Sequence, residues 1–318
     1  MTPDDRLKYV AAKVAAMLHR LRGDRAQGRT GILMYHSVSP CVPGLPERPY
    51  NVTPDVFRKQ LVGLLRSGHR FVKLSEVLAA HRDGVLLPRT VVLTFDDVYE
   101  SIYRHAFPIM KELQVPGAAF LSTSFVGSQD PFPFDDWARI HQAHVPPQEY
   151  RPLSWDQCHE MHESGCFEFG VHTHSHLDFR GKADAFRKDL VQSIEIIRQQ
   201  FQLPSVPFAF PFGATAQGYA GGELQLAAKA AGTSCALTTD GELIDPTTDD
   251  PYAWGRLAVF EWDTSATLAA KLANWYSLAR RANELQVYWR RQAAAATAGI
   301  RRFFHLPVRL FSRGGTSQ

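Results

Sequence analysis

The chain of 318 residues lacks the features that mark membrane-spanning, exported and disulfide-stabilised proteins. No uninterrupted apolar run approaches the roughly 20 residues that cross a bilayer. Residues 1–29 contain no apolar core followed by a small-residue cleavage site, so we expect no secretory signal and a cytoplasmic location. The four cysteines form no CxxC pair. We therefore expect reduced and mostly buried thiols rather than a disulfide framework.

Positive charge is scarce in the middle of the chain and concentrated at its two ends. Residues 1–29 hold seven Lys or Arg against three Asp, and residues 266–318 hold nine against Glu284 alone. Because the whole chain has a net charge of +3, the residues between these ends must be acidic. We divide the chain into an N-terminal amphipathic helix (1–29), a central domain (30–262) and a basic helical C-terminal extension (263–318).

Both basic arms combine arginines with apolar side chains. In the first arm, apolar residues recur at helical spacing on one face: Leu7, Val10, Ala11, Val14, Met17, Leu18 and Leu21. The second arm places arginine pairs among Trp, Tyr and Phe. This pattern fits peripheral contact with the anionic inner face of a membrane, and it fits equally well two arms that pack on the domain and expose solvated Arg. No recognised nucleic-acid-binding module accompanies the charge, so we expect no nucleic-acid partner.

The central residues alternate short apolar runs with amphipathic stretches. The apolar runs predict strands at 31–35, 91–95, 117–122, 167–171, 207–210, 235–238 and 257–260. The amphipathic stretches predict one helix that begins after Thr53. They predict four further helices at 101–113, 155–164, 183–201 and 223–231. Such alternation indicates a parallel α/β architecture, either a barrel or an open sheet.

Polar motifs follow four of these predicted strands at their carboxyl ends. They are His36, Asp96-Asp97, the cluster from His172 to His176, and Pro211-Phe212-Gly213. A barrel collects groups from several strands on one rim, whereas an open sheet binds ligands near a single switch point. Four contributing strands therefore favour the barrel.

Two of these motifs have the composition of a metal site. His172 and His176 lie four residues apart, about eighty residues after Asp96-Asp97. Two imidazoles and a carboxylate can supply three metal ligands and leave open positions for water and substrate. The other Asp of the pair, which does not bind the metal, is then a candidate general base, and this indicates a metal-dependent hydrolase. If residues 172–176 stayed extended, His174 would instead join His172 and His176 in a three-histidine site.

The ordered set of motifs resembles a known family. Thr94–Asp97 (TFDD), His172–His176 (HTHSH) and Phe208–Gly213 (FAFPFG) resemble the motifs of the polysaccharide deacetylases, the carbohydrate esterase family four enzymes that share the NodB homology domain. The resemblance covers roughly residues 30–262. It implies a distorted (β/α) barrel, TIM-like with fewer than eight regular units. It also implies removal of N-acetyl groups from an N-acetylated sugar in a polysaccharide, oligosaccharide or lipid-linked glycan, with release of acetate.

The resemblance also assigns roles to the metal motifs. It makes Asp97, His172 and His176 the metal ligands and Asp96 the base, with His174 beside them as a substrate contact. Two nitrogen ligands and one carboxylate suit Zn²⁺, and Ni²⁺ or Co²⁺ can occupy the same kind of site.

The resemblance implies that the acid that protonates the departing amine comes from a different segment than in most of the family. The usual late Leu-x-His motif is missing, since the only histidine after His176 is His305. The chain is closest to the subgroup of poly-N-acetylglucosamine deacetylases, in which a Tyr-His pair on the first strand supplies this acid. The matching residues here are Tyr35 and His36. A hydrogen-bonded core or rim histidine is the alternative for His36.

Two departures from the family pattern affect the base and the access to the metal. Phe208 stands where the third motif usually begins with an Arg that orients the base, and we expect Arg256 to replace that Arg as a catalytic partner of Asp96. A surface Arg is the alternative. Val98 follows Asp-Asp where Gly is usual, and we expect its side chain to narrow the approach to the metal.

Two aromatic segments are candidates for substrate contact. The Phe212 N–H is expected to donate to the oxyanion that forms during attack on the acetamide. A loop rich in aromatic side chains, with Trp137 as our candidate sugar contact, either walls the cleft or anchors to the barrel as a lid. Its residues are Phe132, Phe134, Asp135, Asp136 and Trp137.

Two other functions remain open at this point. A deformylase or amidase acting on a sugar-lipid would use the same chemistry. A catalytically silent glycan-binding barrel is compatible with the missing Arg and with Val98.

Overall fold

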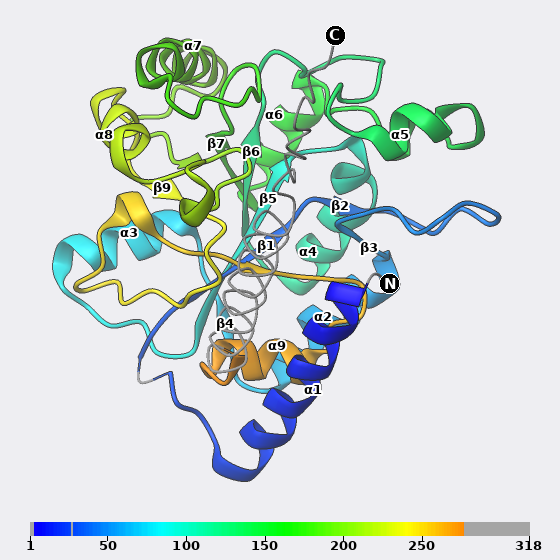
Figure 1. Cartoon of the computed structure of the whole chain (residues 1–318), viewed down its shortest axis with the longest axis vertical. Helices are drawn as coiled ribbons and strands as arrows, with labels where there is room; N and C mark the ends of the chain where they lie inside the picture. The colour runs from blue at the N-terminus through cyan, green and yellow to red at the C-terminus, as the bar shows by residue number, and fades with distance from the viewer. Residues whose placement is uncertain (1–2, 27, 277–318) are drawn as a thin grey trace, which may run out of the picture. The chain divides into compact units, whose positions relative to one another are not determined.

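The computed structural model of the chain describes residues 3–26 and 28–276 (Figure 1). In these residues one curled sheet has the order β10-β1-β5-β6-β7-β8-β9, with β4 paired to β5, and every pairing in it is parallel. Its strands are β1 (Gly31–Tyr35), β4 (Arg70–Phe71), β5 (Thr90–Asp97), β6 (Gly117–Leu121), β7 (Phe167–Val171), β8 (Phe208–Ala209), β9 (Ala236–Leu237) and β10 (Leu257–Ala258). The predicted distorted (β/α) barrel is confirmed.

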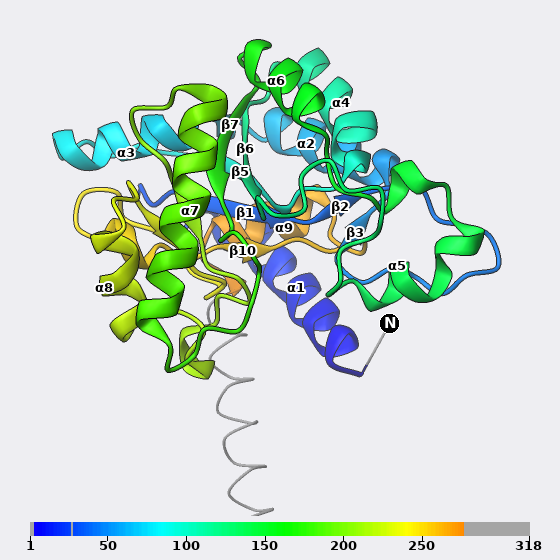
Figure 2. The ribbon, with the colours of Figure 1, turned by 90° about the horizontal axis from the view of Figure 1, so that it is seen from above.

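Helices surround this sheet, and α7 and α8 lie side by side against one part of it (Figure 2). The helices of the central domain are α2 (Pro54–Arg66), α3 (Leu74–Asp83), α4 (Phe107–Leu113), α5 (Asp136–His141), α6 (Trp155–Glu163), α7 (Ala183–Phe201) and α8 (Gly222–Ala230). Two short strands, β2 (Ser37–Val38) and β3 (Asn51–Val52), pair with each other in a separate two-stranded sheet. The predicted helix over 101–113 is divided, because Pro108 falls in the first turn of α4 and a π-helical turn over Ile102–Ala106 precedes it.

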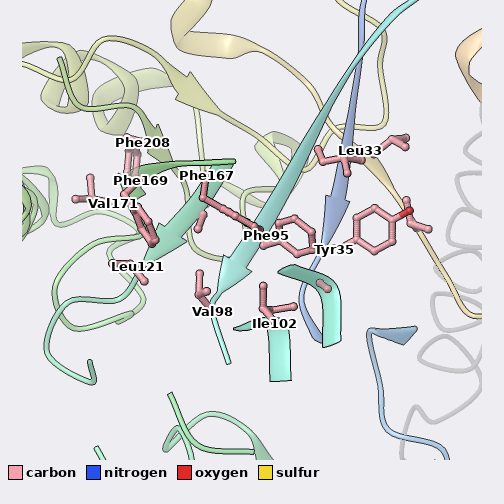
Figure 3. Packing of buried hydrophobic residues seen from close by; sticks show 14 of the residues in the cluster. Leu33, Tyr35, Phe95, Val98, Ile102, Leu121, Phe167, Phe169, Val171 and Phe208 are labelled. Atoms are coloured by element: carbon pink, nitrogen blue, oxygen red, sulfur yellow. The ribbon is translucent and has the colours of Figure 1, made fainter. Parts of the chain in front are cut away.

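The buried side chains form two main layers, one on each face of the sheet. Strand β5 is buried along its whole length. Its residues Val91, Leu93 and Phe95 join the cluster under the outer helices, whereas Val92 joins the cluster inside the barrel. Figure 3 shows the outer cluster, in which the Phe95 ring lies beside Tyr35. Because side chains alternate along a strand, Asp96 follows Val92 and Thr94 toward the interior.

Helix α1 (Pro3–Arg22) packs against α9 (Ser265–Leu272), and α9 also packs against α2. The contact between α1 and α9 uses small side chains, among them Ala15, Ala270 and Ala273. Residues 265–272 of the predicted C-terminal extension are therefore part of this helical layer. The rest of the basic extension, from residue 277 onward, lies outside the described residues.

Candidate active site

Three side chains predicted as metal ligands converge at the carboxyl end of the barrel. The ligand atoms of Asp97, His172 and His176 all lie within 4.8 Å of one another, and all three residues are buried. Asp97 Oδ1 lies 3.6 Å from His172 Nε2 and 3.4 Å from His176 Nε2. Asp97 is the last residue of β5, and His172 directly follows β7. His176 lies in the loop after β7.

Backbone turns bring these side chains to one point. Strand alternation alone would place Asp97 on the face opposite Asp96. Instead, Asp97 has a φ of 62°, and the same left-handed backbone occurs at Thr173 (66°) and His176 (54°). Residues other than glycine adopt this conformation at a cost, and such residues cluster at functional sites.

The three-histidine alternative is wrong. It required residues 172–176 to stay extended, and the turns at Thr173 and His176 prevent this. His174 points toward α7 instead, with Nδ1 2.9 Å from Thr123 Oγ1 and Nε2 3.2 Å from Gln192 Nε2. The structure therefore does not bring His174 to the metal ligands, and its contact with substrate stays a prediction.

The donor set fits a divalent cation. His172 Nδ1 lies 2.8 Å from the Ala209 carbonyl oxygen, which fixes the ring and leaves Nε2 toward Asp97. Asp97 Oδ1 is buried and has no hydrogen-bond partner among the described residues. Burial, and then the charges of Asp96 and Asp135, raise the pKa of the Asp97 carboxyl well above its ordinary value. A buried carboxylate oxygen without a hydrogen-bond partner is costly, and a cation between it and the two imidazoles would remove that cost. Tetrahedral zinc ligands lie about 3.3 Å apart, close to the two distances above.

Asp96 is held by Arg256, the partner predicted from the sequence. Two parallel contacts join the groups, 2.6 Å from Nη1 to Oδ1 and 2.8 Å from Nη2 to Oδ2. The Arg256 side chain is fully buried, and its Nε donates to the Thr238 carbonyl oxygen at 3.0 Å. Burial by itself would raise the pKa of Asp96, but the positive charge of Arg256, supported by His172 and His36, outweighs it and lowers this pKa. The carboxylate beside the metal ligands therefore stays ionised.

Tyr35 and His36, at the end of β1, have different surroundings. Tyr35 is buried in the outer cluster, where its ring stacks near Phe95 and its hydroxyl donates to Gln60 Oε1 at 3.0 Å. Its predicted contact with substrate is wrong, because strand alternation turns it away from the rim. His36 is half-buried beside the Tyr50 ring at a centroid distance of 5.0 Å. Burial lowers the pKa of His36 to about 4, and the nearby charge of Asp96 opposes that shift.

Val98 and Phe212 are both in the left-handed region, with φ of 64° and 61°. Val98 is fully buried in the outer cluster with Ile102 (Figure 3), so the expectation that its side chain narrows the approach to the metal is wrong. Phe212 is about half exposed, and its ring meets His176 edge-on at 5.0 Å. Its position beside a predicted ligand is compatible with the oxyanion role that the sequence predicts.

The aromatic loop covers one side of the site with Phe134 rather than Trp137. The Phe134 ring stacks on the His176 imidazole, with centroids 3.8 Å apart and planes inclined by 19°. Trp137 instead donates from Nε1 to the Pro46 carbonyl oxygen at 3.0 Å. In this position the residue fastens the loop to the segment before β3, and its role as a sugar contact stays a prediction.

Arg48 is the residue of this region that sequence reasoning missed. Its Nη2 lies 2.5 Å from Asp135 Oδ2 in a buried ion pair, and its guanidinium lies 4.3 Å from the centre of the Tyr99 ring. This contact joins two loops that are far apart in the sequence, and no local pattern around Arg48 signals it. Because Asp135 directly follows Phe134, the ion pair holds that ring against His176.

Phe134→Ala is expected to lower metal affinity about tenfold. Loss of a group that orients a metal-bound imidazole typically lowers metal affinity by about 10- to 100-fold. We expect the loss of an aromatic stack to have an effect at the weaker end of this range. Competition with a calibrated chelator measures the effect. Ile140→Ala serves as the matched control, because Ile140 is an exposed side chain on the adjoining helix α5. Equal affinities of Phe134→Ala and the wild-type protein would contradict an orienting role.

Comparison with known proteins bears on this geometry. Residues 84–233, which hold both aspartates, both histidines of the ligand group and the Phe-Ala-Phe-Pro-Phe-Gly motif, match the family model described as Polysaccharide deacetylase. Over these residues the chain is similar to the polysaccharide deacetylase family.

Two proteins similar to this chain carry the name poly-beta-1,6-N-acetyl-D-glucosamine N-deacetylase. The one from Staphylococcus aureus strain MRSA252 is 26% identical over 221 residues, which are 66% of this chain and 68% of the relative. The one from Staphylococcus epidermidis is 28% identical over 173 residues, 52% of this chain and 54% of the relative. The chain thus matches about two thirds of one relative's length and about half of the other's.

Solved structures share the fold of this chain. IcaB from Ammonifex degensii has a TM-score of 0.61 and 24% identity, covering 78% of this chain and 97% of that one. Streptococcus pyogenes deacetylase PplD, solved in complex with acetate, has a TM-score of 0.63 and 20% identity, covering 77% and 98%. The similarity supports the barrel architecture.

Proposed function

We propose that this protein is a metal-dependent N-deacetylase that hydrolyses the acetamide of an N-acetylated glycan and releases acetate. The observation that carries the proposal is the buried group of Asp97, His172 and His176 beside an ionised Asp96. The match of residues 84–233 to the polysaccharide deacetylase model and the names of the staphylococcal relatives support the same activity. A polymer of N-acetylglucosamine is the substrate class that those names indicate.

The residues of the site divide the chemistry among them. Asp97, His172 and His176 would hold the cation, for which Zn²⁺ is our first candidate and Ni²⁺ or Co²⁺ the alternatives; when bound, it polarises the acetamide carbonyl and acidifies water. Asp96 accepts a proton from the attacking water, and Arg256 keeps that carboxylate oriented and ionised. The Phe212 N–H donates to the carbonyl oxygen as negative charge develops there. The carbon–nitrogen bond breaks as a proton reaches the nitrogen, and acetate and a free amino sugar leave. His36 gives that proton in its imidazolium form, which burial disfavours and the negative charge of Asp96 favours.

Acetate release from defined glycans tests this proposal. We expect release from β-1,6-linked N-acetylglucosamine oligomers, loss of that release after chelation, and recovery on addition of Zn²⁺. Parallel assays with N-formylated oligomers test the deformylase alternative, which a higher rate of formate release would favour. If neither product exceeds the background while the protein still binds Zn²⁺, the silent glycan-binding barrel is the better account. The cytoplasmic location stays a prediction, for which cell fractionation is the test.

A further inference from the structure

Helix α1 presents an apolar stripe away from the barrel. Leu7, Val10, Val14, Met17 and Leu21 are between 44% and 73% exposed. They are spaced at helical periodicity, so they form one continuous row along the helix. The helix is held to the protein by a different face, since Ala12 and Ala15 are buried and Ala15 joins the cluster with α9. The packing of α1 therefore leaves a row of five large apolar side chains uncovered, whereas Leu18 packs against the cluster with α9. Such a row is unusual for a helix docked on a globular domain.

A row of basic residues runs directly beside the stripe. Arg6, Lys13 and Arg20 are exposed and lie seven residues apart, which places them on one edge of the apolar face over about 21 Å of helix. The helix as a whole contains five Lys or Arg against two Asp. An apolar stripe edged by Lys and Arg is the pattern of a helix that lies in the plane of an anionic membrane surface.

We propose that α1 docks on an anionic lipid bilayer through this stripe, with Arg6, Lys13 and Arg20 at the level of the headgroups. Among the described helices, none is long and apolar enough to cross a membrane, so the proposed mode is in-plane contact. Two other partners for the apolar stripe are disfavoured by their charge. Residues 277–318 contain eight Arg and one Glu, and a second copy of α1 has the same basic row, so either would bring like charges together. This proposal concerns binding alone and does not depend on the deacetylase activity.

The position of α1 also indicates where the bilayer would lie relative to the active-site end of the barrel. On its packed side, Tyr9 contacts the Trp262 ring edge-on at 5.8 Å, and Lys8 Nζ lies 5.5 Å from the centre of the Phe260 ring. These rings belong to the loop that follows β10, at the same end of the barrel as the ligand group. The first half of α1 is therefore fixed to the active-site end, and a bilayer on its outer face lies alongside that end.

Sedimentation of the full-length protein with lipid vesicles tests the proposal. We expect binding to phosphatidylcholine vesicles that contain about 30% phosphatidylglycerol, and weak binding to phosphatidylcholine alone. The double variant Val14→Ser/Met17→Ser should bind at least about tenfold more weakly, because two apolar side chains no longer enter the interface. The variant Lys13→Gln should lose about fivefold on the anionic vesicles only.

A matched control is Leu226→Ser on α8, since Leu226 is 68% exposed and lies on a helix far along the chain. It should bind as the wild-type protein does, and all variants should keep the wild-type unfolding midpoint because the changed side chains are exposed. The proposal would be overturned if the wild-type protein bound neither kind of vesicle, or if Val14→Ser/Met17→Ser bound as well as the wild-type protein. It would also be overturned if the wild-type protein were a dimer that this variant dissociates while neither protein binds lipid.

Discussion

Asp96→Asn is expected to lower the turnover of acetate release by about 10²- to 10⁴-fold, which is the usual contribution of a general base. An amide cannot accept the proton from water, whereas Asp97 and both histidines remain in place to hold the metal. We therefore expect a normal metal content in the variant, measured by elemental analysis beside the rate. Asp136→Asn is the matched control, because that carboxylate is 82% exposed and outside the site. A rate within about threefold of wild type would show that Asp96 is not the base.

The same variant also disturbs a buried ion pair. Removing one partner of such a pair costs up to about 3–5 kcal/mol, since the other charge is left uncompensated. The double variant Asp96→Asn/Arg256→Leu removes that charge and should recover much of the lost stability in thermal unfolding. Its turnover should stay as low as that of Asp96→Asn. Recovery of activity together with stability would mean that the single variant had failed only as a folded protein.

His172→Ala is expected to weaken metal binding by more than about 100-fold and to abolish acetate release. The variant removes one of three protein ligands, and the neighbouring Asp97 carboxylate then has one imidazole instead of two within reach. Metal titration followed by removal of weakly bound ions measures the loss.

His174→Ala is the control for this experiment, because His174 belongs to the same loop but bonds to Thr123 and Gln192. We expect its metal content to remain near that of the wild-type protein. If His174→Ala loses metal as completely as His172→Ala does, His174 is a metal ligand and the proposed ligand group is wrong.

Much of the barrel follows from local sequence patterns. The strand at 91–95 and the helix at 183–201 are predicted by apolar runs and by helical periodicity, which act over a few residues. Arg256 was predicted as the partner of Asp96 from its place before the last strand, and the ion pair is present. The strands β8 and β10 are shorter than predicted, at two residues each. Apolar runs mark buried segments, but they do not show how much of a segment pairs with its neighbours.

The errors at the site have a common physical cause. Tyr35, His174 and Val98 were placed by adjacency in the sequence, whereas alternation and backbone turns direct their side chains elsewhere. The stack of Phe134 on His176 and the ion pair of Arg48 with Asp135 join segments tens of residues apart. Such contacts depend on the assembled loops, and no single segment encodes them.

Helix α1 shows a similar limit. Its periodicity predicts a helix, and periodicity usually also identifies the face that packs on the core. Here the alanine face is buried against α9, and the face with Leu, Val and Met is exposed. Sequence alone left membrane contact and packing as equal alternatives, and the structure shows that the helix packs while leaving its apolar stripe available.

Anomalous diffraction from crystals grown with Zn²⁺, recorded on both sides of the zinc absorption edge, tests the central claim most directly. The predicted result is one strong peak about 2.0–2.2 Å from an Asp97 oxygen and from one ring nitrogen each of His172 and His176, with Asp96 and Arg256 still paired beside it. A map with zinc bound elsewhere and no density among these three side chains would contradict the account.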